Sequence, residues 1–196
     1  MASLCSPSLH PYIKMLKVIT LLFLVAVALV TAATTDRGHY TVHGLGKRKQ
    51  QILKAGGGIW DLAIAMLESD HMITDYPYGD NKTEDSANFG IFKQNWFMLR
   101  TSTSQFKGKT TSQWKEGTIL NKKLAQDIKA RQESQNFYGP DKWFGGHRFG
   151  ESGLNNPYTE DITNYKNAVN WIHDQLASDP KYLEDDTRFY VSVVAI

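Results

Sequence analysis

Apolar residues recur at helical spacing in several stretches of the chain. In residues 59–69 the apolar positions are Ile59, Ala63, Met66 and Leu67, which share one face of a helix because a turn takes 3.6 residues. Residues 161–177 carry an equivalent stripe of Tyr165, Val169, Ile172 and Leu176. Residues 111–132 are predicted to be mostly helical, and residues 47–55 to form a short basic helix. The pattern therefore predicts a protein rich in helices.

Shorter patterns predict a small amount of β-structure. Residues 76–80 and 87–92 are expected to pair as an irregular hairpin around the polar turn 81–86, and residues 188–196 alternate weakly, as a strand does. Residues 34–46 are polar and are expected to form an arm, whereas glycine and aromatic residues in 137–157 predict a loop. Helices together with one hairpin region indicate an α+β fold.

The first 33 residues have the layout of a secretory signal peptide. Lys14 and Lys17 precede an apolar run at 18–30, and small residues follow it. A run of this length is shorter than the roughly 20 residues of a membrane span, so cleavage is favoured over anchoring. We therefore expect a secreted, extracellular protein in which residues 34–196 form a single domain.

Cysteine content indicates how that domain is stabilised, and its net charge indicates which classes of partner it can bind. Cys5, the only cysteine, lies in the predicted leader, so the mature domain would be held together by packing without disulfides. Removal of the leader leaves twenty basic against twenty acidic residues. A balanced charge gives no long-range attraction to nucleic acid or anionic membrane. A neutral polymer is the expected partner, and the protein is expected to be a monomer.

Two carboxylic acids are candidates for acid–base chemistry. Glu68 stands at the end of the predicted helix 59–69, where the helix dipole and apolar neighbours would raise its pKa. Asp80 follows Tyr-Gly in the predicted hairpin, in a more polar setting. Carboxyl groups in contrasting environments are what glycoside hydrolysis requires. Asp75, Glu84 and Asp85 compete with Asp80, and solvated acids in a turn produce the same pattern.

Other side chains are candidates for sugar binding. Tyr78, Trp96 and Trp143 offer flat faces for sugar rings, although aromatic residues in a small domain are commonly core. His147 and Arg148, in the glycine-rich segment, are candidates for contacts with hydroxyl groups. The only glycosylation sequon is at Asn81. No cluster with metal-ligand spacing is present, and no metal or cofactor is expected.

The segment from Glu68 to Trp96 resembles two related groups of enzymes. Its NFGIFKQN stretch is similar to the hairpin of animal lysozymes, with Asn88 at the position of the lysozyme aspartate. The whole segment, Glu68 with Asp80 twelve residues later and then DSANFGIFKQNW, more closely resembles glycoside hydrolase family 134. WFGGHRFGESG and NAVNWIHDQL extend the resemblance over most of the mature chain. Members of this family are secreted β-1,4-mannanases with a lysozyme-like fold.

The resemblance implies a mainly helical, lysozyme-like fold whose small β-hairpin lines a cleft. It implies that Glu68 is the general acid and Asp80 the general base of an inverting endo-mannanase acting on β-1,4-mannan or manno-oligosaccharides. It also places Asn88, Lys93 and Asn95 on the strand that floors the cleft. Two alternatives stay open: another glycosidase on this fold, a muramidase or chitosanase, or a sugar-binding protein without catalysis.

Overall fold

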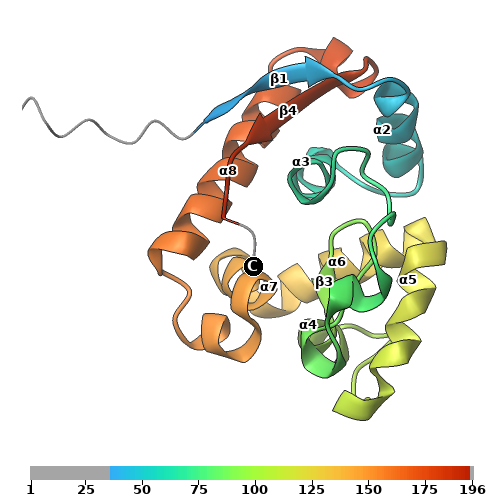
Figure 1. Ribbon diagram of the computed structural model, residues 1–196, viewed down its shortest axis with the longest axis vertical. Coiled ribbons are helices and arrows are strands. Elements are labelled where there is room, and N and C mark those ends of the chain that lie inside the picture. Colours follow the sequence, from blue (N-terminus) through green and yellow to red (C-terminus); the bar gives the residue numbers. More distant parts are fainter. Residues whose placement is uncertain (1–35, 195–196) are drawn as a thin grey trace, which may run out of the picture. The chain divides into compact units, whose positions relative to one another are not determined.

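A computed structural model describes residues 36–194 of the 196-residue chain. The predicted signal peptide, with Cys5, lies outside these residues. The described part is mainly helical, with two small antiparallel sheets (Figure 1). This confirms the predicted α+β class. No helix between residues 36 and 194 is long and apolar enough to cross a membrane.

Seven α-helices lie within residues 36–194, namely α2 (Leu45–Lys54), α3 (Ile59–Glu68), α4 (Trp96–Ser102), α5 (Ile119–Lys122), α6 (Leu124–Tyr138), α7 (Pro140–Asn155) and α8 (Glu160–Ala177). Four 3₁₀ segments accompany them, η1 (Tyr78–Asn81), η2 (Glu84–Ser86), η3 (Thr111–Thr118) and η4 (Pro180–Leu183). The strands are β1 (Arg37–Thr41), β2 (Asn88–Phe89), β3 (Gln94–Asn95) and β4 (Thr187–Val191). The predicted helices around residues 47–55, 59–69, 111–132 and 161–177 are confirmed.

The centre of the core is the contact between α3 and α8. Helix α3 is apolar on nearly every side, and its residues from Asp61 to Met66 are buried, as expected of a helix enclosed by other elements. The predicted stripe of α8 packs against it, with Val169, Ile172 and Leu176 fully buried. This packing sets where the last residue of α3, Glu68, emerges from the core.

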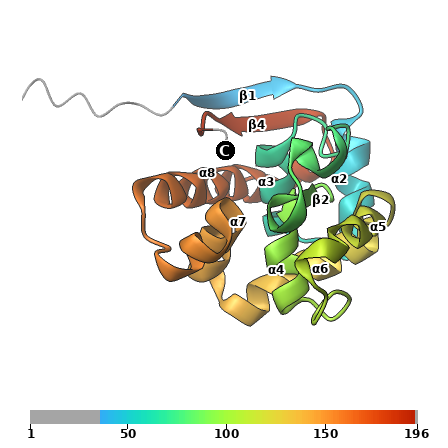
Figure 2. The ribbon, with the colours of Figure 1, turned by 60° about the horizontal axis from the view of Figure 1, so that its bottom comes forward.

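A two-stranded sheet covers one side of this helix pair. Strands β1 and β4 are antiparallel, with Arg37 opposite Val191 and Thr41 opposite Thr187, and β4 contacts both α3 and α8 (Figure 2). The predicted C-terminal strand is confirmed, but the predicted N-terminal arm is wrong over residues 37–41. All but one of these residues are exposed, so they show no alternation of apolar and polar positions. Pairing with β4 is what makes this segment a strand.

The hairpin lies further along the chain than predicted: its strands are residues 88–89 and 94–95, not residues 76–80 and 87–92. Residues 78–81 form the 3₁₀ segment η1 instead of a strand, with Gly79 at φ 63° and Asp80 at φ 59°. Left-handed backbone at consecutive positions interrupts extended pairing. The chain reverses instead between β2 and β3, where Gly90 has φ 76° and Lys93 φ 48°.

The predicted loop at residues 137–157 is also wrong, because most of it is helix α7. Pro140 stands in the first turn, where it is tolerated. A break at Phe149 and Gly150, where the Gly150 φ is 56°, folds the helix back on itself. A Cβ atom on Gly145 would lie 2.2 Å from the Gly153 carbonyl oxygen. The glycines that resemble loop residues are therefore required for close helix packing.

Lys49 of α2 is a fully buried cation that ties α2 to the C-terminal segment. Its Nζ donates to the carbonyl oxygens of Tyr182, Asp185 and Thr187 at 2.6, 2.9 and 2.8 Å. Burial lowers the pKa of Lys49, and the nearby Asp185 carboxylate opposes that shift. The three N–H donors of the Lys49 ammonium group are thus matched by three carbonyl acceptors.

We expect Lys49→Met to lower the free energy of unfolding by about 3 kcal/mol, because it leaves buried carbonyl groups without donors. Urea unfolding followed by circular dichroism measures the change. Lys47→Met is the matched control, since Lys47 is exposed on the same helix, and it should change stability by less than about 0.5 kcal/mol. Equal effects of the two substitutions would contradict the role given to Lys49.

Candidate active site

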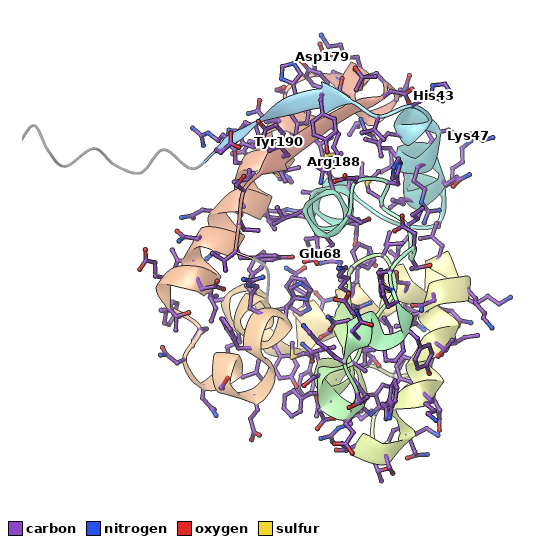
Figure 3. All side chains as sticks on the ribbon, viewed as in Figure 1. His43, Lys47, Glu68, Asp179, Arg188 and Tyr190 are labelled. Atoms are coloured by element: carbon purple, nitrogen blue, oxygen red, sulfur yellow. The ribbon has the colours of Figure 1, made fainter. Side chains whose placement is uncertain are left out.

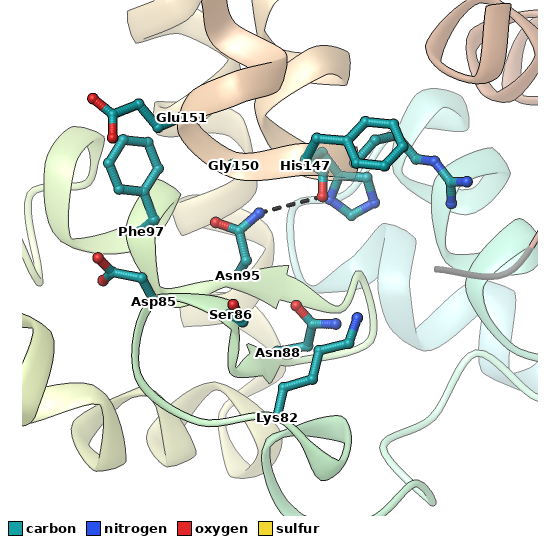
Figure 4. Close-up of a pocket in the computed structure, with 11 residues that line it drawn as sticks. Lys82, Asp85, Ser86, Asn88, Asn95, Phe97, His147, Gly150 and Glu151 are labelled. Atoms are coloured by element: carbon teal, nitrogen blue, oxygen red, sulfur yellow. Dashed lines mark hydrogen bonds between the residues drawn. The ribbon is translucent and has the colours of Figure 1, made fainter.

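Two adjoining hollows form a cleft between the β2–β3 hairpin region and α7. The smaller, of about 200 Å³, is lined by Glu68 and Asp80, among others. The larger, of about 380 Å³, is lined by Phe97, Phe149 and Glu151, among others (Figure 4). Lys82, Asn88, His147 and Arg148 line both hollows. The shared lining makes one continuous groove, which we call the cleft.

Glu68 ends α3 and is held by two side chains from other helices. The hydroxyl of Tyr165, on α8, donates a short hydrogen bond to Glu68 Oε1. Nε2 of His147, on α7, lies 3.0 Å from the same oxygen and 3.0 Å from the Tyr165 hydroxyl oxygen. The Glu68 side chain is 14% exposed and lies near the centre of the described fold (Figure 3). We call these three residues the Glu68 cluster.

The environment of Glu68 differs from the one expected from its place at a helix end. Burial raises the pKa of the Glu68 carboxyl, as expected, but the hydrogen bond and charge of His147, the Tyr165 hydroxyl and the Lys93 charge outweigh burial. The net pKa of Glu68 is lowered, so the expectation of a raised value is wrong in the free protein. The expectation failed because the two polar partners come from helices distant in the sequence.

Tyr165 is suited to act only as a donor toward Glu68. Burial, followed by the charge of Glu68, raises the pKa of the Tyr165 hydroxyl well above its ordinary value. The phenol therefore keeps its proton and fixes the position of Glu68 Oε1. His147 is fixed in turn by the Trp143 ring, which stacks on it at 5.0 Å between centroids and an interplanar angle of 8°.

Asp80, in the 3₁₀ segment η1, lines the same hollow as Glu68. Its backbone is left-handed, and its side chain is 19% exposed. Asn88 Nδ2 donates to Asp80 Oδ2 at 3.1 Å, and Lys93 Nζ lies 3.4 Å from Oδ1. Lys93 also lowers the pKa of Glu68, so its charge acts on both carboxyl groups. The backbone conformation and these two donors aim the Asp80 carboxylate into the cleft.

The other acids considered as the second catalytic group are placed less favourably. Asp75 and Glu84 are exposed and line neither hollow. Asp85 lines the larger hollow, but both of its oxygens pair with Arg100, at 2.6 and 2.7 Å. The Arg100 guanidinium holds the pKa of Asp85 below its ordinary value. Asp80 is the acid that shares a hollow with Glu68.

A buried carboxyl group anchors the hairpin that carries Asn88 and Lys93. Asp127 of α6 accepts hydrogen bonds from the Ile91 backbone N–H and from Gln94 Nε2, both at 2.7 Å. Burial raises the pKa of Asp127 to about 8. A Cβ atom on Gly90 would overlap Asp127 Oδ1, so glycine is needed at this turn. Asp127 thereby fixes the floor of the cleft from behind.

The structure brings most of the predicted binding residues to the cleft. Asn88, Lys93 and Arg148 line the smaller hollow, and Asn95 lines the larger one. Asn95 is also structural, since its side chain caps α4 at the Met98 N–H and donates to the Gly146 carbonyl oxygen. Arg148 is held by both oxygens of Asp161, at 2.8 and 2.9 Å.

Three predicted aromatic contacts are not at the cleft. Trp96 is fully buried and donates through Nε1 to the Thr110 carbonyl oxygen. Trp143 is 1% exposed and supports His147. Tyr78 is 47% exposed, but it lines neither hollow and packs against Trp114. The expectation of a sugar contact is therefore corrected for Trp96 and Trp143, because tryptophan in a domain of this size is needed for the core. For the exposed Tyr78 it stays a prediction.

Sequence reasoning missed several cleft residues. Tyr165 was assigned to the core stripe of its helix, and nothing in the spacing distinguishes a tyrosine that donates to a carboxylate from a core aromatic residue. Phe149 and Glu151 lie on the α7 wall, which the predicted loop obscured, and Phe97 lies on α4, which no sequence pattern indicated. Asn81 is exposed next to Asp80, and its glycosylation stays a prediction. Residues 36–194 contain no cluster of acidic, histidine or cysteine side chains suited to a metal ion.

We expect His147→Leu to raise the pKa of Glu68, because the substitution removes a hydrogen bond and a charge that lower it while burial continues to raise it. A carbon-13 NMR titration of the glutamate carboxyl groups, with the Glu68 signal assigned from Glu68→Gln, measures the shift. His173→Leu is the control, since His173 stacks on Trp60 and lies outside the cleft. An unchanged Glu68 titration in His147→Leu would contradict the cluster.

Comparison with known proteins places this cleft in a family of glycosidases. The model of the family described as glycosyl hydrolase family 134 matches residues 46–193. The match includes Glu68, Asp80, His147 and Tyr165, and it supports the lysozyme-like fold class expected from the sequence. A search of curated proteins found no match.

Proposed function

The chain belongs to glycosyl hydrolase family 134, and from this premise we propose that it is a secreted endo-β-1,4-mannanase that inverts the anomeric carbon. Family membership makes it a glycoside hydrolase with a polysaccharide substrate. The finer assignment, to internal bonds of linear β-1,4-mannan, is our proposal. Residues 34–196 would form its single catalytic domain.

The observation that carries the proposal is that Glu68 and Asp80 line one hollow but have different partners. Glu68 contacts a phenol and an imidazole, so a proton can be held within its cluster. Asp80 contacts an amide and an ammonium group, which are donors only toward a carboxylate. Unlike environments divide acid and base roles between two carboxyl groups.

Glu68 is assigned as the general acid. His147 and Tyr165 both contact Oε1, so we assign Oε2 to the glycosidic oxygen. The active form is the one in which the Glu68 carboxyl group carries a proton on Oε2. A sugar chain in the cleft displaces water, which favours the neutral carboxylic acid over the carboxylate. Glu68 then donates its proton as the bond between the anomeric carbon and the leaving oxygen breaks.

Asp80 is assigned as the general base. It accepts a proton from a water molecule whose oxygen forms the new bond to the anomeric carbon on the face opposite the leaving oxygen. Asn88 and Lys93 hold Asp80 in place while its charge is neutralised by that proton. In inverting glycosidases the carboxyl groups stand about 6.5–9.5 Å apart, which admits the water.

The charge of the predicted mature chain favours mannan over bacterial wall polymers. Twenty basic and twenty acidic residues give no net attraction to an anionic wall, whereas mannan is uncharged. A muramidase or chitosanase on the same fold is the alternative that substrate comparison tests.

We expect the wild-type protein to release sugar from linear β-1,4-mannan, and Glu68→Gln and Asp80→Asn each to lower kcat by about 10²–10⁴-fold, since each removes one proton-transfer group. A reducing-sugar assay measures this, with clearing of peptidoglycan suspensions as the second substrate. Asp75→Asn is the matched control and should retain activity.

Peptidoglycan clearing without mannan hydrolysis would contradict the mannanase assignment. Full activity of Asp80→Asn together with inactivity of Asp75→Asn would contradict the choice of base. Normal activity of folded Glu68→Gln would contradict catalysis by the Glu68 cluster.

A further inference from the structure

A third hollow, of about 430 Å³, lies apart from the cleft. It is bounded by the first turn of α3, the end of α6, the start of α7 and the middle of α8, and it shares no lining residue with the two hollows of the cleft. Its apolar wall is made by Trp60 and Phe144, and its polar wall by Gln135, Asn136, Lys166 and Asn170. The catalytic proposal uses none of these residues.

Trp60 gives this hollow a fixed aromatic surface. The residue is 40% exposed, although it stands in the first turn of the most deeply buried helix. The His173 ring stacks on it with a centroid distance of 4.3 Å and an interplanar angle of 25°. Stacking on one face holds the indole in a single orientation and leaves the rest of the ring to the hollow. An indole that lines a hollow and is held by stacking offers a flat apolar surface together with an N–H donor.

The polar side chains around Trp60 are free to bind a ligand. The side-chain amides of Asn136 and Asn170 make no hydrogen bond with residues 36–194, and Gln135 uses its oxygen to accept from Arg131 Nη1 at 2.8 Å. Each amide offers donors and an acceptor, as the hydroxyl groups of a sugar require. Lys166, the charged side chain among the lining residues, forms an ion pair with Asp141 next to the hollow, so its charge is balanced locally.

We propose that this hollow is a second carbohydrate-binding site, which holds mannose units of the polymer outside the catalytic cleft. The inference rests on the proposed function for the identity of the sugar. A pyranose ring has an apolar face, which fits Trp60, and a rim of hydroxyl groups, which fits Asn136 and Asn170. An uncharged site suits an uncharged polymer.

The position of the site explains how it would serve the enzyme. Trp60 and Glu68 stand at opposite ends of α3, eight residues or about 12 Å apart along the helix axis. A chain held at Trp60 therefore leaves the cleft open to another segment of the polymer. Holding the enzyme on insoluble mannan raises the local concentration of bonds that the cleft can reach, whereas short soluble substrates gain nothing.

The test measures binding of the Glu68→Gln protein to insoluble linear mannan by co-sedimentation. Addition of Trp60→Ala should weaken binding by about three- to tenfold, the range of an aromatic stacking contact. Asn136→Ala with Asn170→Ala should also weaken it, and these surface changes keep the core intact. Tyr158→Ala is the matched control, because Tyr158 is 74% exposed and lines none of the three hollows.

In the active protein, Trp60→Ala should slow hydrolysis of insoluble mannan and leave hydrolysis of mannohexaose unchanged. The proposal is overturned if Trp60→Ala and the double asparagine variant bind mannan as the Glu68→Gln protein does, or if the activity of Trp60→Ala on mannohexaose falls as far as its activity on insoluble mannan. Failure of the mannanase assignment is seen separately, as absence of sugar release from either substrate by the wild-type protein.

Discussion

Three helices meet at the carboxyl group of Glu68, and the geometry of the cleft depends on this contact. Glu68 ends α3, His147 comes from α7 and Tyr165 from α8. A carboxylate this far buried is costly unless donors satisfy it, so the two partners hold it inside the fold and fix its direction. Packing between α3 and α8 sets the distance between Glu68 and Tyr165. The close approach of Gly145 and Gly153 within α7 lets His147 reach Glu68. The position of the Glu68 carboxyl group is thus a consequence of helix packing.

The opposite wall is built by backbone conformation more than by packing. Gly79, Asp80 and Asn81 all have positive φ, which costs free energy for the two residues that are not glycine. Asn88 and Lys93 bond the Asp80 side chain, and the hairpin bearing them is fixed from behind by Asp127. The cost of the strained turn is therefore offset by contacts that point a carboxylate into the cleft. Asp80 and Glu68 therefore line one hollow but are positioned by different parts of the fold.

The sequence was informative wherever one element sets its own pattern. The stripes of α3 and α8, the helix-terminal place of Glu68 and the nearby Asp80 are all visible in local spacing. It failed where the outcome depends on a distant partner: residues 37–41 become a strand only against β4, and residues 140–155 become a helix although their glycines resemble a loop. The lowered pKa of Glu68 and the role of Tyr165 failed for the same reason, since both arise from contacts between helices far apart in the chain. Burial likewise decided that Trp96 and Trp143 stabilise the core.

In the proposed mechanism Glu68 is the acid and Asp80 the base, with one water molecule between the base and the sugar. The stereochemistry of the first product tests this arrangement most directly, because it reports which face of the anomeric carbon the water attacks. Proton NMR of a fresh digest of β-1,4-mannohexaose, recorded before the anomers interconvert, separates the two forms. An inverting mechanism on a β-linked substrate releases the α-anomer first, which is the expected result. The β-anomer appearing first would contradict it, since retention requires a covalent intermediate that the assigned roles of Glu68 and Asp80 exclude.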